Sequence, residues 1–346
     1  MAILCLVPKQ ERRFEMKNKK GLPFLTMIGL VLALSTLTFE AALASGPIEM
    51  KAVAFLPTRS IETKMFIEFI EDVQKKTGGE LKIKLLGGPE VMSSREQVDA
   101  LQSGVVQIAI IPPSYYAKKV PVISADYLIG SSSAEKRKNG FYDILAELTE
   151  KADMRFLGEV NSAEGMYMYT NFMVNNPRTD FKGKKLRTLE TYDKFLDGLG
   201  AAGVVVPRMD IYAAMERGVI NGFLAPVYQI MQFGLVEVVK YLIHPQMWWG
   251  GCFINLNLDT WKKLPQDIQK VLLDTMSEKE KKWESIFIQM DGEERGKLKG
   301  KGVKEIKFSP EDEKWFVNLA LTKEWEDIIK QDPANANRVR KFIFAN

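Results

Sequence analysis

The amino-acid sequence predicts an α/β protein of two lobes that face each other across a cleft. Two observations favour this fold class. A helix–strand–helix–strand order occurs twice, about a hundred residues apart, and helix-forming residues then run from Pro265 to about residue 299. A length of 346 residues suits about two domains. With 46 % hydrophobic and 27 % charged residues, the composition excludes disordered, collagen-like and polytopic membrane proteins.

The first copy of the repeated order begins near Ile61, where apolar residues recur at helical spacing. Thr77-Gly78-Gly79 ends this helix, because glycine is favoured just past helix C-termini. Leu81, Ile83 and Leu85 then alternate with lysines, which predicts a strand with one face in water. A helix over 94–103 that ends at Gly104 and a buried strand over 105–111 complete the copy.

The second copy is expected at 191–199 (helix), 204–206 (strand), 210–217 (helix) and 219–224 (strand). Residues 100–107 and 214–221 also align one by one. Two copies are too few for a solenoid, so two facing lobes are the better interpretation.

The remaining elements expected are a helix over 138–151 and strands over 155–160, 166–174, 184–187 and 252–258. The helix from Pro265 would be roughly 50 Å long at 1.5 Å per residue, enough to brace both lobes. We therefore assign residues 45–164 and about 252–285 to lobe I, and residues 165–251 and about 286–346 to lobe II.

The first 44 residues have the pattern of a secretory signal. Lys17, Lys19 and Lys20 precede an apolar run over 24–34, and Ala42-Leu43-Ala44 places small residues before a cleavage point at Ala44/Ser45. The alternative, a retained membrane anchor, would need a run nearly twice as long. The start codon stays open between Met1 and Met16. The sequence thus predicts an exported, periplasmic protein.

Charge and rare residues exclude several further classes. Residues 1–44 hold six basic and three acidic side chains, so the formal charge of +4 falls to +1 for a chain that begins at Ser45. Such a chain has no electrostatic footprint for nucleic acid. His244 is the single histidine and Cys252 the single cysteine of that chain. We therefore expect no metal site, no cofactor and no catalytic triad or dyad.

Arg187 is the leading candidate for ligand binding. It ends the strand expected over 184–187, and ligands of open α/β sheets lie outside the carboxyl ends of strands. Its planar guanidinium matches a carboxylate through two parallel hydrogen bonds. The alternative is a solvated charge. Trp248 and Trp249 are a second candidate, beside Gly250-Gly251, with burial in the core as the alternative.

Four stretches resemble the solute-binding proteins of tripartite ATP-independent periplasmic (TRAP) transporters, the DctP-type family. They are Leu86-Gly87-Gly88-Pro89-Glu90 with Ser94-Arg95-Glu96 through Gly104; Phe181-Lys182-Gly183-Lys184-Lys185-Leu186-Arg187; Leu199-Gly200-Ala201 through Met215, then Gly218 to Gly222 and Pro226; and Trp261-Lys262-Lys263-Leu264-Pro265 with Ile268-Gln269-Lys270. In this order they cover nearly all of the chain after the signal.

The resemblance implies a type II periplasmic binding fold, in which ligand closes the cleft between the lobes. It implies that Arg187 clamps a ligand carboxylate, and that small and large membrane permease subunits accept the closed form. A monomer is expected on the same grounds. Two departures bear on the ligand: Tyr167 stands where sialic-acid-type relatives carry a second arginine, and Ala225 stands where they carry asparagine.

Loss of a cation and an amide makes a second carboxylate or a polyol harder to hold. The sequence therefore predicts a receptor for an aromatic or bulky apolar monocarboxylate. The expected ligand-binding residues are Arg187, Tyr167, Tyr116, Phe223, Trp248, Trp249, Asn171 and Ser114.

Three alternatives stay open at this point. A receptor for a C4-dicarboxylate or 2-oxo acid would use another cation, such as Lys64. An exported carboxylate-processing enzyme would use Glu96 or Glu190 as acid and base. The protein would alternatively report to a membrane sensor in place of a permease.

Overall fold

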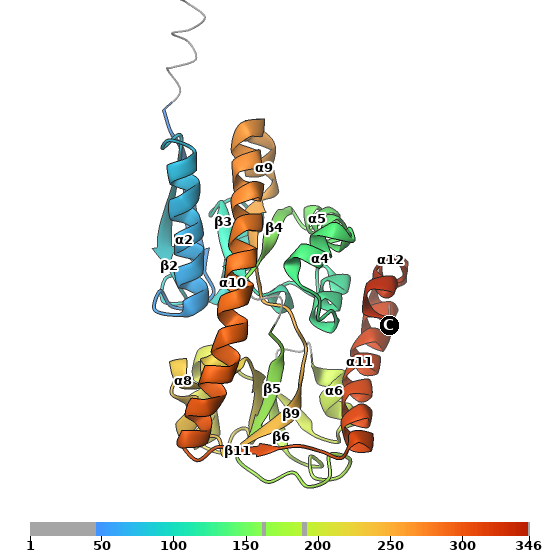
Figure 1. Cartoon of the computed structure of the whole chain (residues 1–346). Helices are drawn as coiled ribbons and strands as arrows, with labels where there is room; N and C mark the ends of the chain where they lie inside the picture. Colours follow the sequence, from blue (N-terminus) through green and yellow to red (C-terminus); the bar gives the residue numbers. More distant parts are fainter. Residues whose placement is uncertain (1–45, 161–163, 189–191, 345–346) are drawn as a thin grey trace, which may run out of the picture. The chain divides into compact units, whose positions relative to one another are not determined.

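The computed structural model describes residues 46–160, 164–188 and 192–344, and residues Ile48–Asn346 form one compact unit. The predicted signal with its cleavage point, and Glu190, lie outside the described residues. Within the compact unit, two separate β-sheets carry helices around them (Figure 1).

The first sheet has five strands in the order β2-β1-β3-β10-β4. Their bounds are β1 (Ile48–Ala54), β2 (Leu81–Gly87), β3 (Ile108–Ile111), β4 (Met154–Val160) and β10 (Cys252–Asn257). β1 is parallel to β2 and β3, whereas β10 is antiparallel to β3 and β4. The helices around it are α2 (Ile61–Lys76), α3 (Ser94–Gln102), α4 (Ser133–Lys138), α5 (Phe141–Glu150) and α9 (Leu258–Lys263), with the 3₁₀ segments η1 (Pro113–Tyr115) and η2 (Pro121–Leu128).

The second sheet has six strands in the order β11-β9-β5-β8-β6-β7. Their bounds are β5 (Met166–Thr170), β6 (Lys185–Thr188), β7 (Ala202–Val205), β8 (Gly222–Ala225), β9 (Tyr241–Met247) and β11 (Lys304–Ile306). β6 is parallel to β7 and β8, and β5 is antiparallel to β8 and β9. The shorter helical segments here are α6 (Asp193–Gly198), η3 (Arg208–Asp210), α7 (Ile211–Glu216), α8 (Val227–Gln232) and η4 (Leu235–Glu237).

The long helix α10 (Gln266–Gly300) contacts elements of both lobes. It packs against β4, α2 and α4 of the first lobe and against α8 of the second (Figure 1). The predicted two-lobe α/β fold with a bracing helix is therefore confirmed.

The expected lobe boundaries stay a prediction. All strands of each sheet fall within the residues assigned to that lobe. The two C-terminal helices do not divide so simply. α11 (Pro310–Gln331) packs against α6 and also η2, and α12 (Pro333–Ile343) packs against α5 and η2 of lobe I.

Several elements differ in extent from the sequence expectation. The strand expected over 105–111 begins only at Ile108, and the strand expected over 166–174 ends at Thr170. β9 contains Pro245 and was not predicted, because proline disfavours strand interiors. Pro245 is tolerated here: β9 pairs with β5 at Met168–Thr170 and again at Met166, with a register break between them.

Candidate functional site

A cavity of about 50 Å³ lies where residues of both lobes meet the connection between β9 and β10. It is lined by Phe55, Pro112, Ser114, Tyr115, Tyr127, Met166, Arg187, Tyr192, Arg208, Pro226, Tyr228, Gln229, Gly250, Gly251 and Cys252. Five of these side chains are aromatic. The walls are therefore mostly apolar, with a few polar groups at defined points, as in small-molecule sites generally.

The topology explains why these residues converge. Phe55 follows β1 and Ser114 follows β3, so both lie at the carboxyl ends of parallel strands of the first sheet. Arg187 lies near the end of β6 and Arg208 follows the parallel strand β7. Carboxyl ends of parallel strands share one edge of a sheet, where ligands bind in open α/β folds.

Arg187 is buried with part of its hydrogen-bonding capacity unused. Only 2 % of the residue is exposed, and its Nε donates to the carbonyl oxygen of Val206 at 3.0 Å. Its Nη2 has no hydrogen-bond partner among the described residues. Burial, and next the nearby charge of Arg208, lower the pKa of Arg187 to about 10. An anion placed here would satisfy the free N–H groups and offset the cost of burying the charge.

Arg208 is the second cation of the cavity, and sequence reasoning missed it. Its Nη1 is buried and, within the described part of the chain, has no hydrogen-bond partner. The available signal was its place directly after a strand of the second copy, the same position that singled out Arg187. Among the described residues that line the cavity, Arg187 and Arg208 are the charged ones.

Some of the polar groups around the arginines already form hydrogen bonds within the protein. The Tyr127 hydroxyl accepts a hydrogen bond from the backbone N–H of Ser114 at 3.3 Å. The Tyr228 hydroxyl and Gln229 Nε2 donate to Oε1 of Glu62 in α2, at 3.0 and 2.7 Å. Burial raises the pKa of the Glu62 carboxyl. Gln229, which also lines the cavity, keeps an acceptor atom, Oε1, without a partner among the described residues.

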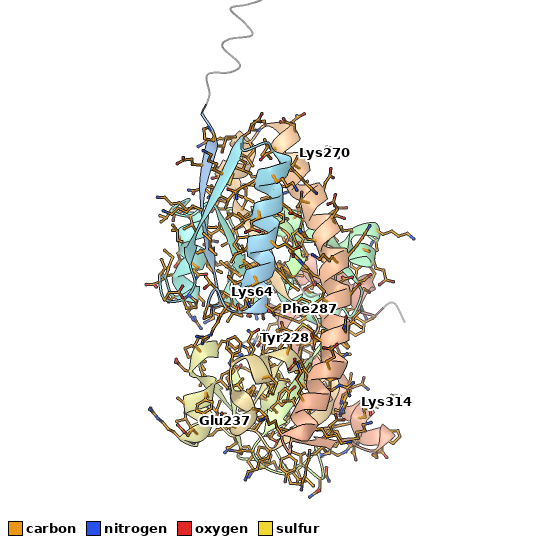
Figure 2. All side chains as sticks on the ribbon, turned by 60° about the vertical axis from the view of Figure 1, so that its left-hand side comes forward. Lys64, Tyr228, Glu237, Lys270, Phe287 and Lys314 are labelled. Atoms are coloured by element: carbon orange, nitrogen blue, oxygen red, sulfur yellow. The ribbon has the colours of Figure 1, made fainter. Side chains whose placement is uncertain are left out.

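These hydrogen bonds join the two lobes beside the cavity. Glu62 lies on α2 of lobe I, whereas Tyr228 and Gln229 lie on α8 of lobe II. The ring of Tyr228 also packs on Phe287 of α10, with ring centroids 5.0 Å apart (Figure 2).

Two of the eight residues predicted to bind ligand, Arg187 and Ser114, line this cavity. The other six lie elsewhere, and their assignment to the ligand stays a prediction that the geometry does not favour. They are Tyr116, Tyr167, Asn171, Phe223, Trp248 and Trp249.

Three of the six lie in or beside β5 and β8. Tyr167 points to the face opposite Met166, which lines the cavity, and its ring meets His244 at 5.3 Å. Phe223 is fully buried and stacks on Tyr169. Asn171 follows β5, and its backbone N–H donates to Asn221.

The local backbone conformation directs Tyr116 and the two tryptophans away from the cavity. The 3₁₀ segment η1 places Tyr115 in the cavity, while Tyr116 is buried and accepts a hydrogen bond from Asn255. Trp248 has a positive φ of 49° and packs on Tyr192 and Phe195. Trp249 lies against Gly130. The neighbouring Gly250 and Gly251 line the cavity in their place.

Two of the residues named for the alternative functions, Lys64 and Glu96, also lie outside the cavity, and Glu190 is outside the described residues. Lys64 is exposed on α2 (Figure 2). Glu96 forms a capping box with Ser93 at the start of α3, and this hydrogen bond lowers the pKa of Glu96. In the described part of the chain, no group of three or more His, Cys, Asp or Glu side chains is arranged to hold a metal ion. No helix there is both long and apolar enough to cross a bilayer.

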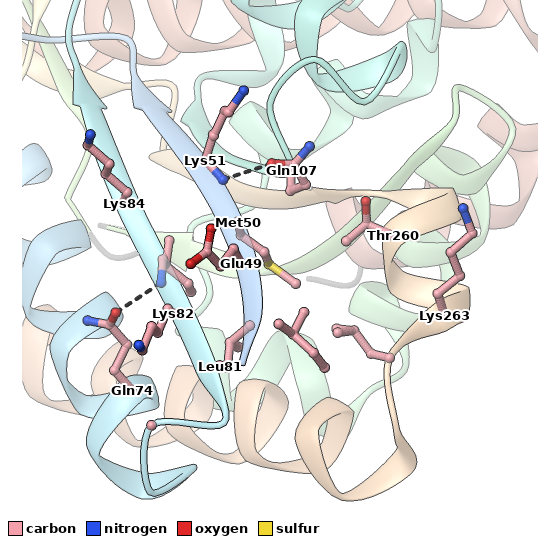
Figure 3. A pocket seen from close by; sticks show the side chains of 14 residues that line it. Glu49, Met50, Lys51, Gln74, Leu81, Lys82, Lys84, Gln107, Thr260 and Lys263 are labelled. Carbon is pink, nitrogen blue, oxygen red and sulfur yellow. Dashed lines mark hydrogen bonds between the residues drawn. The ribbon is translucent and has the colours of Figure 1, made fainter. Parts of the chain in front are cut away.

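A larger hollow of about 1120 Å³ lies at the start of β1 and β2. Lys51, Lys84 and Lys263 are spread around it and do not converge on one point (Figure 3). It contains none of the eight predicted residues. The smaller cavity between the lobes is therefore the candidate site.

A two-lobe α/β fold with a cavity between the lobes is typical of proteins that bind small molecules. Residues 52–332 match the family of bacterial extracellular solute-binding proteins, family 7 (DctP), and the chain belongs to this family. It is thus a TRAP-type extracytoplasmic receptor for organic acids that works with membrane permease subunits, and it is not an enzyme.

The chain is similar to several known proteins. It is 24 % identical over 248 residues to a monocarboxylate 2-oxoacid-binding periplasmic protein of Nostoc sp., covering 69 % of this chain and 68 % of that one. It is 26 % identical over 258 residues to the C4-dicarboxylate-binding periplasmic protein DctP of Rhodobacter capsulatus, covering 71 % and 75 %. A TRAP solute-binding protein from Desulfovibrio salexigens, solved with orotic acid, superimposes with a TM-score of 0.78 at 19 % identity, covering 85 % of this chain and 97 % of that one.

Proposed function

We propose that this receptor captures the carboxylate of an organic acid between Arg187 and Arg208 and delivers the acid to its permease. The observation that supports this proposal is the pair of guanidinium groups in one cavity, each with a buried N–H nitrogen that lacks a partner among the described residues. A buried, unpaired charge is costly, so a charged ligand stabilises the site.

The favoured ligand is a monocarboxylate with an aromatic or bulky apolar body. Phe55, Tyr115 and Tyr192 offer rings to such a body, and the described lining has no carboxylate to repel the head group. A second candidate of the same family, a small dicarboxylate or 2-oxo acid, is favoured by one observation. Arg208 supplies the second cation that the sequence seemed to lack.

A thermal-shift panel on protein freed of co-purified ligand tests the ligand class. At 100 times its dissociation constant, a ligand adds about 2.7 kcal/mol to the free energy of unfolding. Shifts with phenyl or indole acids, but not with succinate or malate, support the favoured ligand. Shifts with small dicarboxylates alone support the second candidate.

Substitution of the arginines tests the clamp. Arg187→Ala should weaken binding of the best acid at least about thirtyfold, since loss of one partner of a buried charge pair costs about 2 kcal/mol or more. Arg187→Lys keeps the charge but removes the planar fork, and should also bind more weakly. The control is Arg217→Ala, an exposed arginine of the same lobe outside the cavity. Parent-like affinity of Arg187→Ala would show that the clamp is misassigned.

We also propose that the receptor is exported, cleaved after Ala44, and works as a monomer. The basic and apolar pattern of residues 17–44 supports export. The intact mass of secreted protein should match a chain that begins at Ser45, and light scattering should give the mass of one chain. A mass that includes residues 24–34 would instead indicate a retained anchor.

A further inference from the structure

A second chamber, of about 250 Å³, adjoins the arginine cavity between the lobes. The two share three residues, Phe55, Tyr115 and Arg208. Lobe I adds Pro89, Ser93, Ser94 and Arg95 to the chamber, and lobe II adds Val205, Pro207 and Met209. The rings of Phe55 and Tyr115, with centroids 6.5 Å apart, stand where the two spaces meet.

The two spaces differ in size. At about 10–15 Å³ for each water, the inner cavity holds roughly four waters, which suits a carboxylate with one or two further atoms. The chamber is five times larger by the same measure. An acid whose head reaches Arg187 therefore extends its body past Phe55 and Tyr115 into the chamber.

The free surface of this chamber is apolar. Val205 and Met209 are 50 % and 39 % exposed, unusual for large apolar side chains. The serine hydroxyls there are already used, and Arg208, whose Nη1 has no partner among the described residues, is shared with the arginine cavity. The Ser93 hydroxyl bonds with Glu96 in the helix cap, and the Ser94 hydroxyl donates to the carbonyl oxygen of Phe55. Arg95 also has an interaction within the chain.

We propose that this chamber is a subsite for the apolar tail of the ligand, and that it selects carboxylic acids with an aryl or extended alkyl body over short acids. The inference rests on the proposed carboxylate site and assigns specificity to Val205 and Met209. An apolar tail would cover their exposed surface, and burial of that surface strengthens binding. None of the aromatic residues predicted from the sequence, such as Tyr116 or Trp248, takes part.

Calorimetry with two matched pairs of acids tests the proposal. Phenylpyruvate shares its head group with pyruvate, and 3-phenylpropionate shares its head group with propionate. On the chain that begins at Ser45, freed of ligand by unfolding and refolding, the phenyl acid should bind at least tenfold more tightly than its short partner. Val205→Trp, which fills the chamber, should weaken the phenyl acids at least tenfold and change the short acids less than threefold.

The control is Val219→Trp, because Val219 is similarly exposed (45 %) on the same lobe and lines neither space. Short acids that bind as tightly as their phenyl partners would overturn the subsite, as would a Val205→Trp variant that weakens both members of a pair equally. In both cases the carboxylate site would stand. If none of the four acids binds the parent but succinate or malate does, the subsite fails and the carboxylate site stands. If no acid of either set binds, the proposed function fails together with the subsite.

Discussion

Lys136 is a fully buried cation between two buried carboxylates. Its Nζ lies 2.8 Å from Oδ1 of Asp126 and 3.3 Å from Oε1 of Glu159, and all three side chains are fully buried. Asp126 also lies close to the connection that lines the cavity, because a Cβ on Gly250 would stand 2.5 Å from Asp126 Oδ2. The ion pair with Lys136 therefore holds Asp126 in place against Gly250, which lines the cavity.

Lys136→Met should lower the free energy of unfolding by about 3–5 kcal/mol, since it leaves two buried carboxylates without their cation. Lys138→Met, at an exposed position of the same helix, should stay within about 0.5 kcal/mol. Urea unfolding of both variants measures the difference. Equal stabilities would show that the cluster protonates without penalty.

Because Glu62 is buried, the free energy of unfolding depends on pH, and the direction of this dependence follows from the raised pKa. Because burial raises its pKa above the ordinary 4.5, the folded protein keeps this proton to a higher pH than the unfolded chain does. The folded state therefore binds more protons in that window, and the free energy of unfolding falls as the pH rises from about 4.5 toward the raised pKa.

Glu62→Gln should remove this contribution. Urea unfolding at pH 5, 6, 7 and 8 should show the parent losing stability relative to the variant as the pH rises. Parallel curves for the two proteins would mean that Glu62 does not titrate in this range.

Single residues of the cavity were predictable from the sequence where their position in a strand alone decides whether they line it. Arg187 was found because strand ends of parallel sheets meet at one edge. Tyr115 was missed in favour of Tyr116 because a 3₁₀ turn, not a strand, sets which of the two faces the cavity. Arg208 was missed because it lies beyond the end of β7, in the turn that forms η3, and not in the strand itself.

At the scale of elements, the repeat found in the sequence corresponds to equivalent turns and hydrogen bonds in the two lobes. Gly104 after α3 and Gly218 after α7 both have positive φ, 74° and 69°. Gln107 Oε1 then accepts from the backbone N–H of Lys51, just as Asn221 Oδ1 accepts from that of Lys185. The aligned residues 100–107 and 214–221 therefore perform the same task, binding the neighbouring strand, β1 at Lys51 and β6 at Lys185.

A glycine just after a helix and a glycine inside a helix predict opposite effects of substitution by alanine. Gly218→Ala should cost about 1–2 kcal/mol of stability, from backbone strain alone, because nothing lies within 4 Å of the added Cβ. Gly296→Ala lies inside α10, also with open space, and should gain up to about 1 kcal/mol from helix propensity. Thermal unfolding compares the pair, and a loss in both would contradict the role of φ.

The bounds of an element were predictable where the spacing of apolar residues and a terminating glycine or proline indicate the same end. They were less predictable elsewhere. α10 was expected from Pro265 to about residue 299 and runs from Gln266 to Gly300. The apolar run over 105–111 suggested too long a strand. Val105 is 59 % exposed in the turn after Gly104, because the chain is still leaving the helix there. Strand β11 has only three residues, too few for a period to show.

At the scale of the whole compact unit, contacts between α2 and α8 couple the lobes. Besides the hydrogen bonds to Glu62, the backbone N–H of Ile61 donates to Oε1 of Gln232 at 3.2 Å. Both helices pack on α10, so this contact closes a ring of three helices from the two lobes. A ligand that favours the closed form gains from each of these bonds, since its apparent affinity scales with the closed fraction.

Tyr228→Phe should weaken acid binding about fivefold, because it removes one buried hydrogen bond worth about 1 kcal/mol while the ring stays on Phe287. The matched control is Tyr212→Phe, which removes an exposed hydrogen bond to Glu237 within lobe II. Small-angle scattering of protein saturated with the acid separates closure from contact. A larger radius of gyration in Tyr228→Phe alone indicates loss of the closed form. Weaker binding with an unchanged radius would instead mean that the hydroxyl acts on the ligand directly.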